Sequence, residues 1–281
     1  MSTDAPPTGD RDRPSLVGTP QQRREDDHLL TGDSRYTDDI QSADQLHMAI
    51  HRSQYGHARV ESIDTAAAEA VEGVVAVYTR ADLEENGVAT EMLDDEPEFG
   101  VTAKRQVLAG ETVRHQGDPI AAVVAEDRYV AADAAELIDV DYERLDAVVD
   151  VTRATDDDAP TIHEAADDNV ALRWAAGDED ATAEAFESAA DVVEVTLDIN
   201  QVVAVPMEPR ATVADYRAAD GRLEVEVSCQ HVFKVQDDLS AMLGVPEHKV
   251  SVSAPDVGGA FGVKIPSYPG TVLPAFASMR L

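Results

Sequence analysis

The sequence predicts an α+β protein in which one mixed domain is followed by the beginning of a second. Two observations support this fold class. A strand–helix–strand order occurs twice in the first half, and in the second half an alternating apolar strand precedes a helical apolar spacing. With 281 residues, 43% of them apolar, the chain is long enough to bury a substantial core.

The first half contains the two strand–helix–strand units. The first unit consists of a strand at Leu46–Ile50, a short alanine-rich helix at Asp64–Val71 and a strand at Val74–Tyr78. The second consists of a strand at Pro119–Ala125, a helix at Asp127–Leu137 and a strand at Ile138–Tyr142. Asp127 is a favourable N-cap for its helix. These units predict a domain over residues 23–150, whereas residues 1–22 lack apolar periodicity and predict a disordered tail.

The second half begins with an acidic stretch, residues 151–169, which predicts a linker. The elements expected after it are a helix at Asp180–Ala190, a strand at Val192–Ile199, a turn at Pro206–Arg210, a strand at Leu223–Val227, a helix carrying Val232, Val235, Leu239 and Met242, and a strand at Val250–Ser253. They predict a second domain over residues 170–281. We expect this domain to be unfinished, and therefore to expose apolar faces that include Val225, Val227, Val232 and Leu239.

The charge balance bears on the class of partner. Asp and Glu outnumber Lys and Arg by 56 to 22, so the formal net charge is -34. A field of this sign repels phosphate backbones and anionic lipids, which counts against nucleic-acid and membrane-surface roles. The composition, with only four lysines among the basic residues, is typical of a halophilic cytosolic protein. Because no apolar run approaches the roughly 20 residues that span a bilayer, we expect a cytoplasmic location.

The strongest local feature is the glycine-rich segment GGAFGVK at Gly258–Lys264, directly after the last predicted strand. Glycines let a backbone approach a ligand closely and present successive N–H groups to an anion. The segment is neither a Walker loop nor a Rossmann fingerprint. From the residues alone, two interpretations stay open: a cofactor-binding loop, or a tight turn between strands, which is the commoner of the two for an isolated match.

Other polar residues give weaker signals. Gln230 ends a predicted strand and can either contact a ligand or cap the following helix. The single cysteine, Cys229, excludes a disulfide framework and any multi-cysteine iron–sulfur or zinc site within the chain, and favours a small buried residue. His47, His51 and His57 lie close together in sequence, but no further ligand spacing completes a metal site. We therefore assign no catalytic residue and no metal ligand.

Several segments match a known family in order and spacing. They are Leu29–Gly32 (LLTG), Tyr36–Ile40 (YTDDI), HARVESID ending at Asp64, Val123–Tyr129 with the AADAAELIDVDYE run, PMEPRA at Pro206–Ala211, and Leu243–Lys264. Together they resemble the molybdopterin-binding large subunit of the xanthine dehydrogenase and aerobic carbon monoxide dehydrogenase family. The resemblance implies an α/β hammerhead domain at 23–150 and, at 170–281, the start of a molybdenum-cofactor domain.

The resemblance also implies roles and partners. Gln230, Gly258, Gly259, Phe261 and Gly262 match positions that in the family line the molybdenum centre and its pterin. The implied cofactor is molybdenum–molybdopterin, as the pterin or its dinucleotide. The implied partners are the remainder of the large subunit, an iron–sulfur small subunit and a flavin medium subunit.

Two positions depart from relatives. Ile265 follows Lys264 where purine-oxidising members have a glutamate, so xanthine is a poor candidate substrate. Ala260 replaces the central glycine of GGGFG, and a positive φ there would cost about 1 kcal/mol.

Two functions are compared. The first is the amino-terminal portion of a molybdenum hydroxylase large subunit, which oxidises carbon monoxide, an aldehyde or a heterocycle and is inactive as this chain alone. The alternative is a truncated or split-gene product that acts only as a binding or assembly module.

Overall fold

A computed structural model describes residues 17–93, 103–166, 168–200 and 202–281. The chain divides into two compact units, Met1–Arg35 and Tyr36–Leu281, and each is described by itself. The first unit contains the short helix α1 (Asp26–Thr31), which ends at Gly32 in the left-handed conformation, φ 84°. Of the predicted tail, only residues 17–22 are described, and they form turns and coil.

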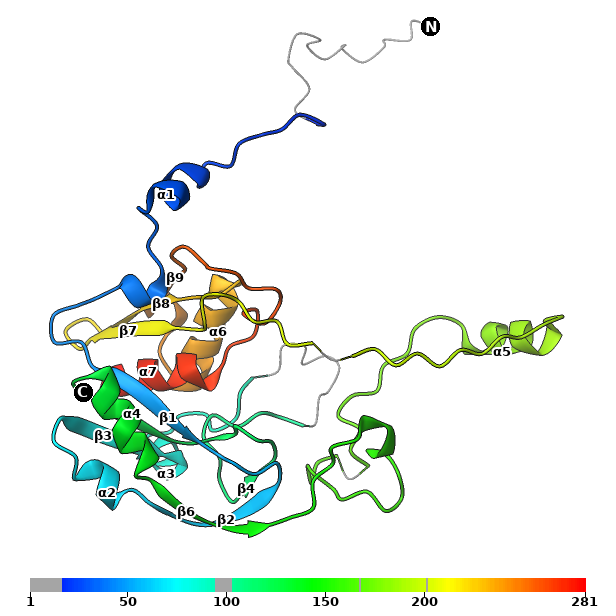
Figure 1. Cartoon of the computed structure of the whole chain (residues 1–281), viewed down its shortest axis with the longest axis horizontal. Coiled ribbons are helices and arrows are strands. Elements are labelled where there is room, and N and C mark those ends of the chain that lie inside the picture. The colour runs from blue at the N-terminus through cyan, green and yellow to red at the C-terminus, as the bar shows by residue number, and fades with distance from the viewer. Residues whose placement is uncertain (1–16, 94–102, 167, 201) are drawn as a thin grey trace, which may run out of the picture. The chain divides into compact units, whose positions relative to one another are not determined.

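The described part of the second unit contains three three-stranded sheets, which can be followed in Figure 1. The strands are β1 (His47–Arg52), β2 (Ala58–Asp64), β3 (Val74–Thr79), β4 (Thr112–Val113), β5 (Pro119–Ala125), β6 (Asp139–Arg144), β7 (Thr212–Arg217), β8 (Arg222–Val227) and β9 (Val250–Ser253). Their orders are β1-β5-β3, β4-β2-β6 and β7-β8-β9. Only the β8–β9 pair is parallel among these.

Helices and turns connect the strands. They are α2 (Ala66–Glu69), α3 (Arg80–Glu85), α4 (Arg128–Glu136), α5 (Glu179–Ser188), α6 (Val232–Leu243) and α7 (Pro269–Arg280), with 3₁₀ turns η1 (Thr37–Asp39), η3 (Val151–Arg153) and η4 (Glu247–Lys249). The strands and helices predicted for residues 46–142 are confirmed. The structure adds strand β2 and the short elements α3 and β4; α3 and β4 are too brief to show an apolar period.

Strand β5 is the centre of the first sheet. All seven of its residues are buried, because β1 and β3 flank it on both sides and α4 packs against it. Helix α4 begins after Asp127, whose carboxylate accepts hydrogen bonds from the backbone N–H of Tyr129 and Val130. This confirms the predicted N-cap, which satisfies amides that would otherwise lack a partner.

The predicted acidic linker, residues 151–169, is tied down by one side chain. The Asn169 side-chain nitrogen donates to the carbonyls of Ala154 and Pro160, and its oxygen accepts from the N–H of Ile162. Apart from η3, the described residues of this stretch form turns and one isolated bridge. The segment therefore has a defined path without a helix or strand of ordinary length.

The strand predicted at Val192–Ile199 is wrong. These residues form no ladder, and their apolar side chains are exposed, from 59% at Val192 to 84% at Ile199. An alternating pattern yields a strand only where another strand accepts its backbone hydrogen bonds, and none of the described residues supplies that edge. The predicted helix before it is confirmed as α5.

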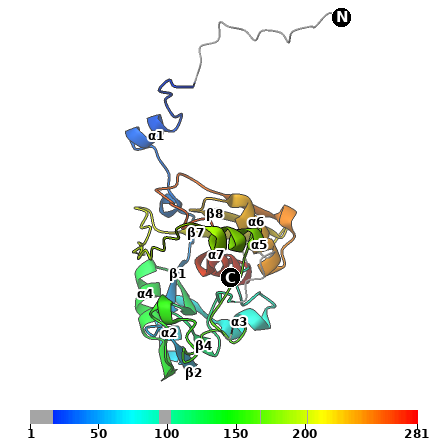
Figure 2. The same ribbon diagram turned by 90° about the vertical axis from the view of Figure 1, so that its right-hand side faces the viewer.

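The expectation that Val225, Val227, Val232 and Leu239 lie exposed is also wrong. The first two are buried on β8, Leu239 is buried on α6, and Val232 is partly buried. Figure 2 shows α7 beside the β7–β8 sheet, and Phe276 of α7 is buried in the same cluster. These apolar side chains are therefore buried by contacts among β8, α6 and α7 and with residues of the first half.

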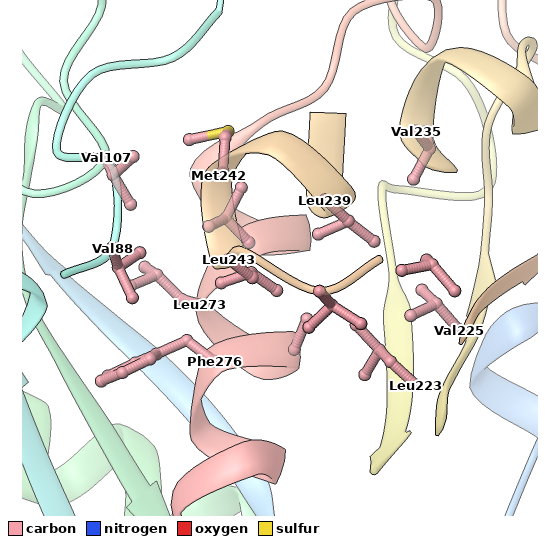
Figure 3. Close-up of a cluster of buried hydrophobic side chains, with 14 of the residues drawn as sticks. Val88, Val107, Leu223, Val225, Val235, Leu239, Met242, Leu243, Leu273 and Phe276 are labelled. Atoms are coloured by element: carbon pink, nitrogen blue, oxygen red, sulfur yellow. The ribbon is translucent and has the colours of Figure 1, made fainter. Parts of the chain in front are cut away.

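That shared cluster is drawn in Figure 3. Its labelled side chains are Val88, Val107, Leu223, Val225, Val235, Leu239, Met242, Leu243, Leu273 and Phe276. Val88 and Val107 come from the first predicted domain, and the others come from the second. Apolar surface of both halves is therefore removed from water in one cluster, which contributes to the stability of both.

Candidate functional site

The segment Gly258–Lys264, called here the glycine loop, connects the residues after β9 to those before α7. Three of its residues have positive φ: Gly259 at 97°, Phe261 at 51° and Gly262 at 85°. Ala260 has no positive φ, so the strain expected at that position does not occur. The left-handed non-glycine position is Phe261 instead, and it carries a cost of about 1 kcal/mol.

The loop presents unused backbone donors. Among the described residues, the N–H groups of Gly259, Ala260 and Phe261 donate to no protein acceptor. Residues with alternating sign of φ turn successive N–H groups toward one side and form a concave anion site. The Phe261 side chain is 74% exposed, so the loop lies at the protein surface. The loop can therefore receive an anionic oxygen through its backbone.

Gln230 contacts the carboxyl-terminal part of the glycine loop. Its side-chain oxygen accepts hydrogen bonds from the backbone N–H of Gly262 at 2.9 Å and of Lys264 at 3.3 Å. The backbone N–H of Gln230 donates to the Lys264 carbonyl. The helix-capping alternative is wrong, because His231 caps α6 by accepting from the N–H of Lys234. Within the described residues, the side-chain nitrogen of Gln230 donates to no protein acceptor.

The carboxylate of Glu208 contacts the first residue of the loop, Gly258, and its last residue, Lys264. Glu208 Oε2 accepts hydrogen bonds from the Gly258 N–H at 2.8 Å, from Lys264 Nζ at 2.9 Å and from Ser228 Oγ at 2.6 Å. Burial by itself raises the pKa of Glu208, but the hydrogen bonds from Ser228, Lys264 and Gly258 outweigh it and hold the pKa below its ordinary value. The ionised carboxylate is thus the form that the site stabilises.

Sequence reasoning missed this arrangement. Glu208 and Lys264 lie 56 positions apart, so no local spacing connects them. A signal was nevertheless present, since the chain has only four lysines and one of them is the last residue of the glycine loop. A buried lysine requires a carboxylate partner, which directs attention to the acidic residue of the PMEPR turn.

A third contact anchors the loop through Tyr268. Its hydroxyl donates to the carbonyl of Val263 at 2.9 Å. The guanidinium of Arg210 lies 3.9 Å from the Tyr268 ring centre, and that of Arg105 lies 5.0 Å away. Such cation–π contacts favour one position of the ring. The loop is therefore fixed from the PMEPR turn, from the residues directly after β8 and from the segment before α7.

The remaining candidate residues have packing roles. Cys229 is buried, and burial raises the pKa of its thiol, which disfavours the reactive thiolate. His51 and His57 each place Nδ1 against a backbone carbonyl, of Ala135 and Asp146 respectively. Within the described ranges, no group of three His, Cys, Asp or Glu residues is arranged to hold a metal ion. No helix in that part of the chain is both long and apolar enough to cross a membrane.

Two family models match the chain. Residues 31–146 match the a/b hammerhead domain of aldehyde oxidase and xanthine dehydrogenase, and residues 162–281 match the molybdopterin cofactor-binding domain. The carbon monoxide dehydrogenase large chain of Afipia carboxidovorans is 36% identical, over 94% of this chain and 34% of the relative. The nicotine 6-hydroxylase large subunit of Paenarthrobacter nicotinovorans is 37% identical, over 95% of this chain and 32% of the relative.

Solved structures give the same result. Carbon monoxide dehydrogenase from Oligotropha carboxidovorans superposes with a TM-score of 0.85 at 36% identity, over 94% of this chain and 34% of that one. Quinoline 2-oxidoreductase from Pseudomonas putida 86 gives a TM-score of 0.80 at 35% identity, over 95% and 34%. The chain spans about a third of the length of these relatives. It belongs to the family of molybdopterin-binding large subunits that includes carbon monoxide dehydrogenase and xanthine dehydrogenase.

Proposed function

We propose that the chain serves as the amino-terminal portion of the large subunit of a molybdenum hydroxylase, and that its glycine loop binds the molybdenum–pterin cofactor. The observation that carries this proposal is the row of free N–H groups at Gly259, Ala260 and Phe261, in a chain whose second half matches a molybdopterin-binding domain. Backbone donors held in a fixed concave arrangement suit an anionic oxygen ligand.

The site residues fit such a ligand. The amides of Gly259 and Phe261 would donate to its anionic oxygens, together with the side-chain nitrogen of Gln230. Gly258 and Gly262 would shape the loop, since a Cβ at Gly258 meets Glu208 at 2.6 Å and Gly262 has a φ of 85°. When bound, the molybdenum centre supplies two-electron oxidation with water as the oxygen source. This chain's own residues bind and orient it.

We propose carbon monoxide, an aldehyde or a nitrogen heterocycle as the substrate class. Relatives at 36% and 37% identity are a carbon monoxide dehydrogenase and a nicotine 6-hydroxylase. Ile265, which follows Lys264, is 44% exposed and offers no carboxylate to a purine. This favours small or apolar substrates over xanthine.

The domain arrangement and partners belong to the same proposal. We place the hammerhead domain at 23–150, the linker at 151–169 and the cofactor-domain start at 170–281. The two family models match residues 31–146 and 162–281, so the second match begins within the proposed linker. The partners would be the remainder of the large subunit, an iron–sulfur subunit and a flavin subunit, in the cytoplasm. The apolar side chains of residues 192–199, together with Val202, Val203 and Val205, are exposed in this chain and are suited to be covered by further chain.

The charge also supports a halophilic origin. Net charge -34 repels itself until the Debye length falls to about 3 Å near 1 M salt. We expect the thermal midpoint to fall as potassium chloride is lowered from molar to millimolar. A midpoint independent of salt would contradict this origin.

The test of the function measures molybdenum in the complete large subunit, after this chain and the downstream reading frame are expressed together. Gly259→Val should lower molybdenum content, because φ is 97° there and a Cβ meets the Phe261 ring at 3.0 Å. The matched control is Gly177→Val, at a glycine with φ 106° and open space around it. Equal content in both variants would count against the loop as the cofactor site.

The alternative is a split-gene product that acts as a binding or assembly module. The two functions differ in what the DNA downstream of Leu281 encodes and in turnover. An adjacent frame for the rest of the subunit, with dye reduction by the joint product, supports the enzyme. Stoichiometric molybdenum with turnover by the 281-residue chain alone would contradict the proposal that further chain is required.

A further inference from the structure

Glu208 contacts both ends of the glycine loop with one oxygen. Oε2 accepts from the N–H of Gly258, the first residue of the loop, and from Nζ of Lys264, the last. It also accepts from Ser228 Oγ, which itself lies 2.6 Å from Lys264 Nζ. One carboxylate thereby sets the separation of the two loop ends.

The contact with Gly258 runs in both directions. The backbone N–H of Glu208 donates to the Gly258 carbonyl at 3.2 Å, while Oε2 accepts from the Gly258 N–H at 2.8 Å. A Cβ on Gly258 would lie 2.6 Å from the Glu208 Cβ, closer than carbon atoms approach. Glycine is therefore required here by the approach of Glu208 and not by a positive φ.

Lys264 makes the carboxylate necessary. Its side chain is fully buried, and its Nζ donates hydrogen bonds to Glu208 Oε2 and to Ser228 Oγ. A buried ammonium without a carboxylate is strongly destabilising. The pair therefore locks the ionised form of Glu208 at the base of the loop.

We propose that Glu208 is a positioning residue for ligand binding: it holds Gly258 and Lys264 so that the N–H groups of Gly259, Ala260 and Phe261 converge on one anionic oxygen. The identity of the ligand rests on the proposed function. The positioning itself concerns only the loop and can be measured without the cofactor.

A catalytic reading of the same residues fails on burial. Ser228 beside Lys264 resembles a serine–lysine nucleophile pair, which requires an accessible hydroxyl and a neutral amine. Ser228 is only 3% exposed, and Lys264 donates to a carboxylate. The arrangement fits a charged anchor and not a nucleophile.

The first test compares Glu208→Gln with Glu224→Gln in the 281-residue chain at molar salt. Glu224 is half-exposed on β8 and pairs with Arg217 at the surface, so its variant is the matched control. Hydrogen exchange of residues 258–264 and chymotryptic cleavage after the exposed Phe261 should each become about tenfold faster in Glu208→Gln only. Unchanged rates in Glu208→Gln would overturn the proposal.

A second variant separates positioning from stability. Glu208→Leu with Lys264→Met replaces the buried ion pair by apolar side chains, which often leaves stability near that of the parent. If Glu208 positions the loop, hydrogen exchange of the loop should stay about tenfold faster in this double variant than in the parent chain, even where the denaturation midpoint returns to that of the parent. A restored midpoint together with restored loop protection would show a purely structural role and overturn the proposal.

The third measurement uses molybdate as the probe of the amide site. In the ¹⁵N-labelled parent chain, molybdate should shift the amide resonances of Gly259, Ala260 and Phe261. The double variant should require an about tenfold higher molybdate concentration for the same shifts. Equal affinity in both proteins would contradict the positioning role. If neither protein binds molybdate and the loop still exchanges faster in the variant, positioning is supported and the proposed oxyanion ligand is contradicted.

Discussion

Strand β8 and the segment Val192–Ile199 have the same alternating pattern but different structures. On β8, Leu223, Val225 and Val227 are buried, and the strand pairs with β7 on one side and β9 on the other. In the segment Val192–Ile199, Leu197 is 75% exposed and no ladder forms. Alternation therefore identifies the face that can be buried, but a neighbouring strand and a covering helix decide whether it is buried.

The largest expected effect tests this difference directly. Leu223→Ala should lower the free energy of unfolding by about 2 to 5 kcal/mol, because it empties a fully buried site. Leu197→Ala should change it by less than about 0.5 kcal/mol, as for other exposed positions. Chemical denaturation at molar potassium chloride measures both. Similar losses would show that the segment Val192–Ile199 is packed in solution.

A glycine comparison is expected to have the next largest effect. Gly258→Ala should destabilise the chain by about 1 to 3 kcal/mol, since the new Cβ overlaps Glu208. Gly270→Ala, in the first turn of α7 with open space around it, should be neutral or stabilising. Thermal unfolding distinguishes them, and an equal response of the two variants would contradict the close approach at Gly258.

The pH dependence concerns the same anchor and should be smaller, because a single group titrates. The pKa of Glu208 is lowered in the fold, so its contribution is fully present above the unfolded value, about 4.3, and is lost as pH falls through the folded value. The difference in stability between the parent and Glu208→Gln should therefore shrink below about pH 4.3. The control is Glu194→Gln in the exposed segment, and the same trend there would contradict this assignment.

The smallest effect is expected at Ala260. Because its φ is not positive, Ala260→Gly should destabilise the loop by about 0.4 to 1 kcal/mol through greater freedom of the unfolded chain. Exchange of residues 258–264 measures the change. Slower exchange in the variant would show that alanine is strained at this position after all.

Much of the fold could be predicted from the sequence. The alternation at β1 and β8, the Asp127 cap of α4 and the helical spacing of α6 are local properties, and each gave the observed element. The glycine loop was also visible as a candidate site, because its residue types restrict the backbone wherever they occur. The charge of the chain followed from composition alone.

Tertiary structure decided the rest. Only the folded chain places Glu208 beside Lys264, 56 positions away. Likewise, only the folded backbone shows that the positive φ belongs to Phe261 and not to Ala260. Only packing buries Val225 while leaving Val195 exposed, although both stand in alternating runs. The physical reason is the same in each case: a side chain's burial, charge partner and backbone conformation depend on residues distant in sequence, and the local pattern does not contain them.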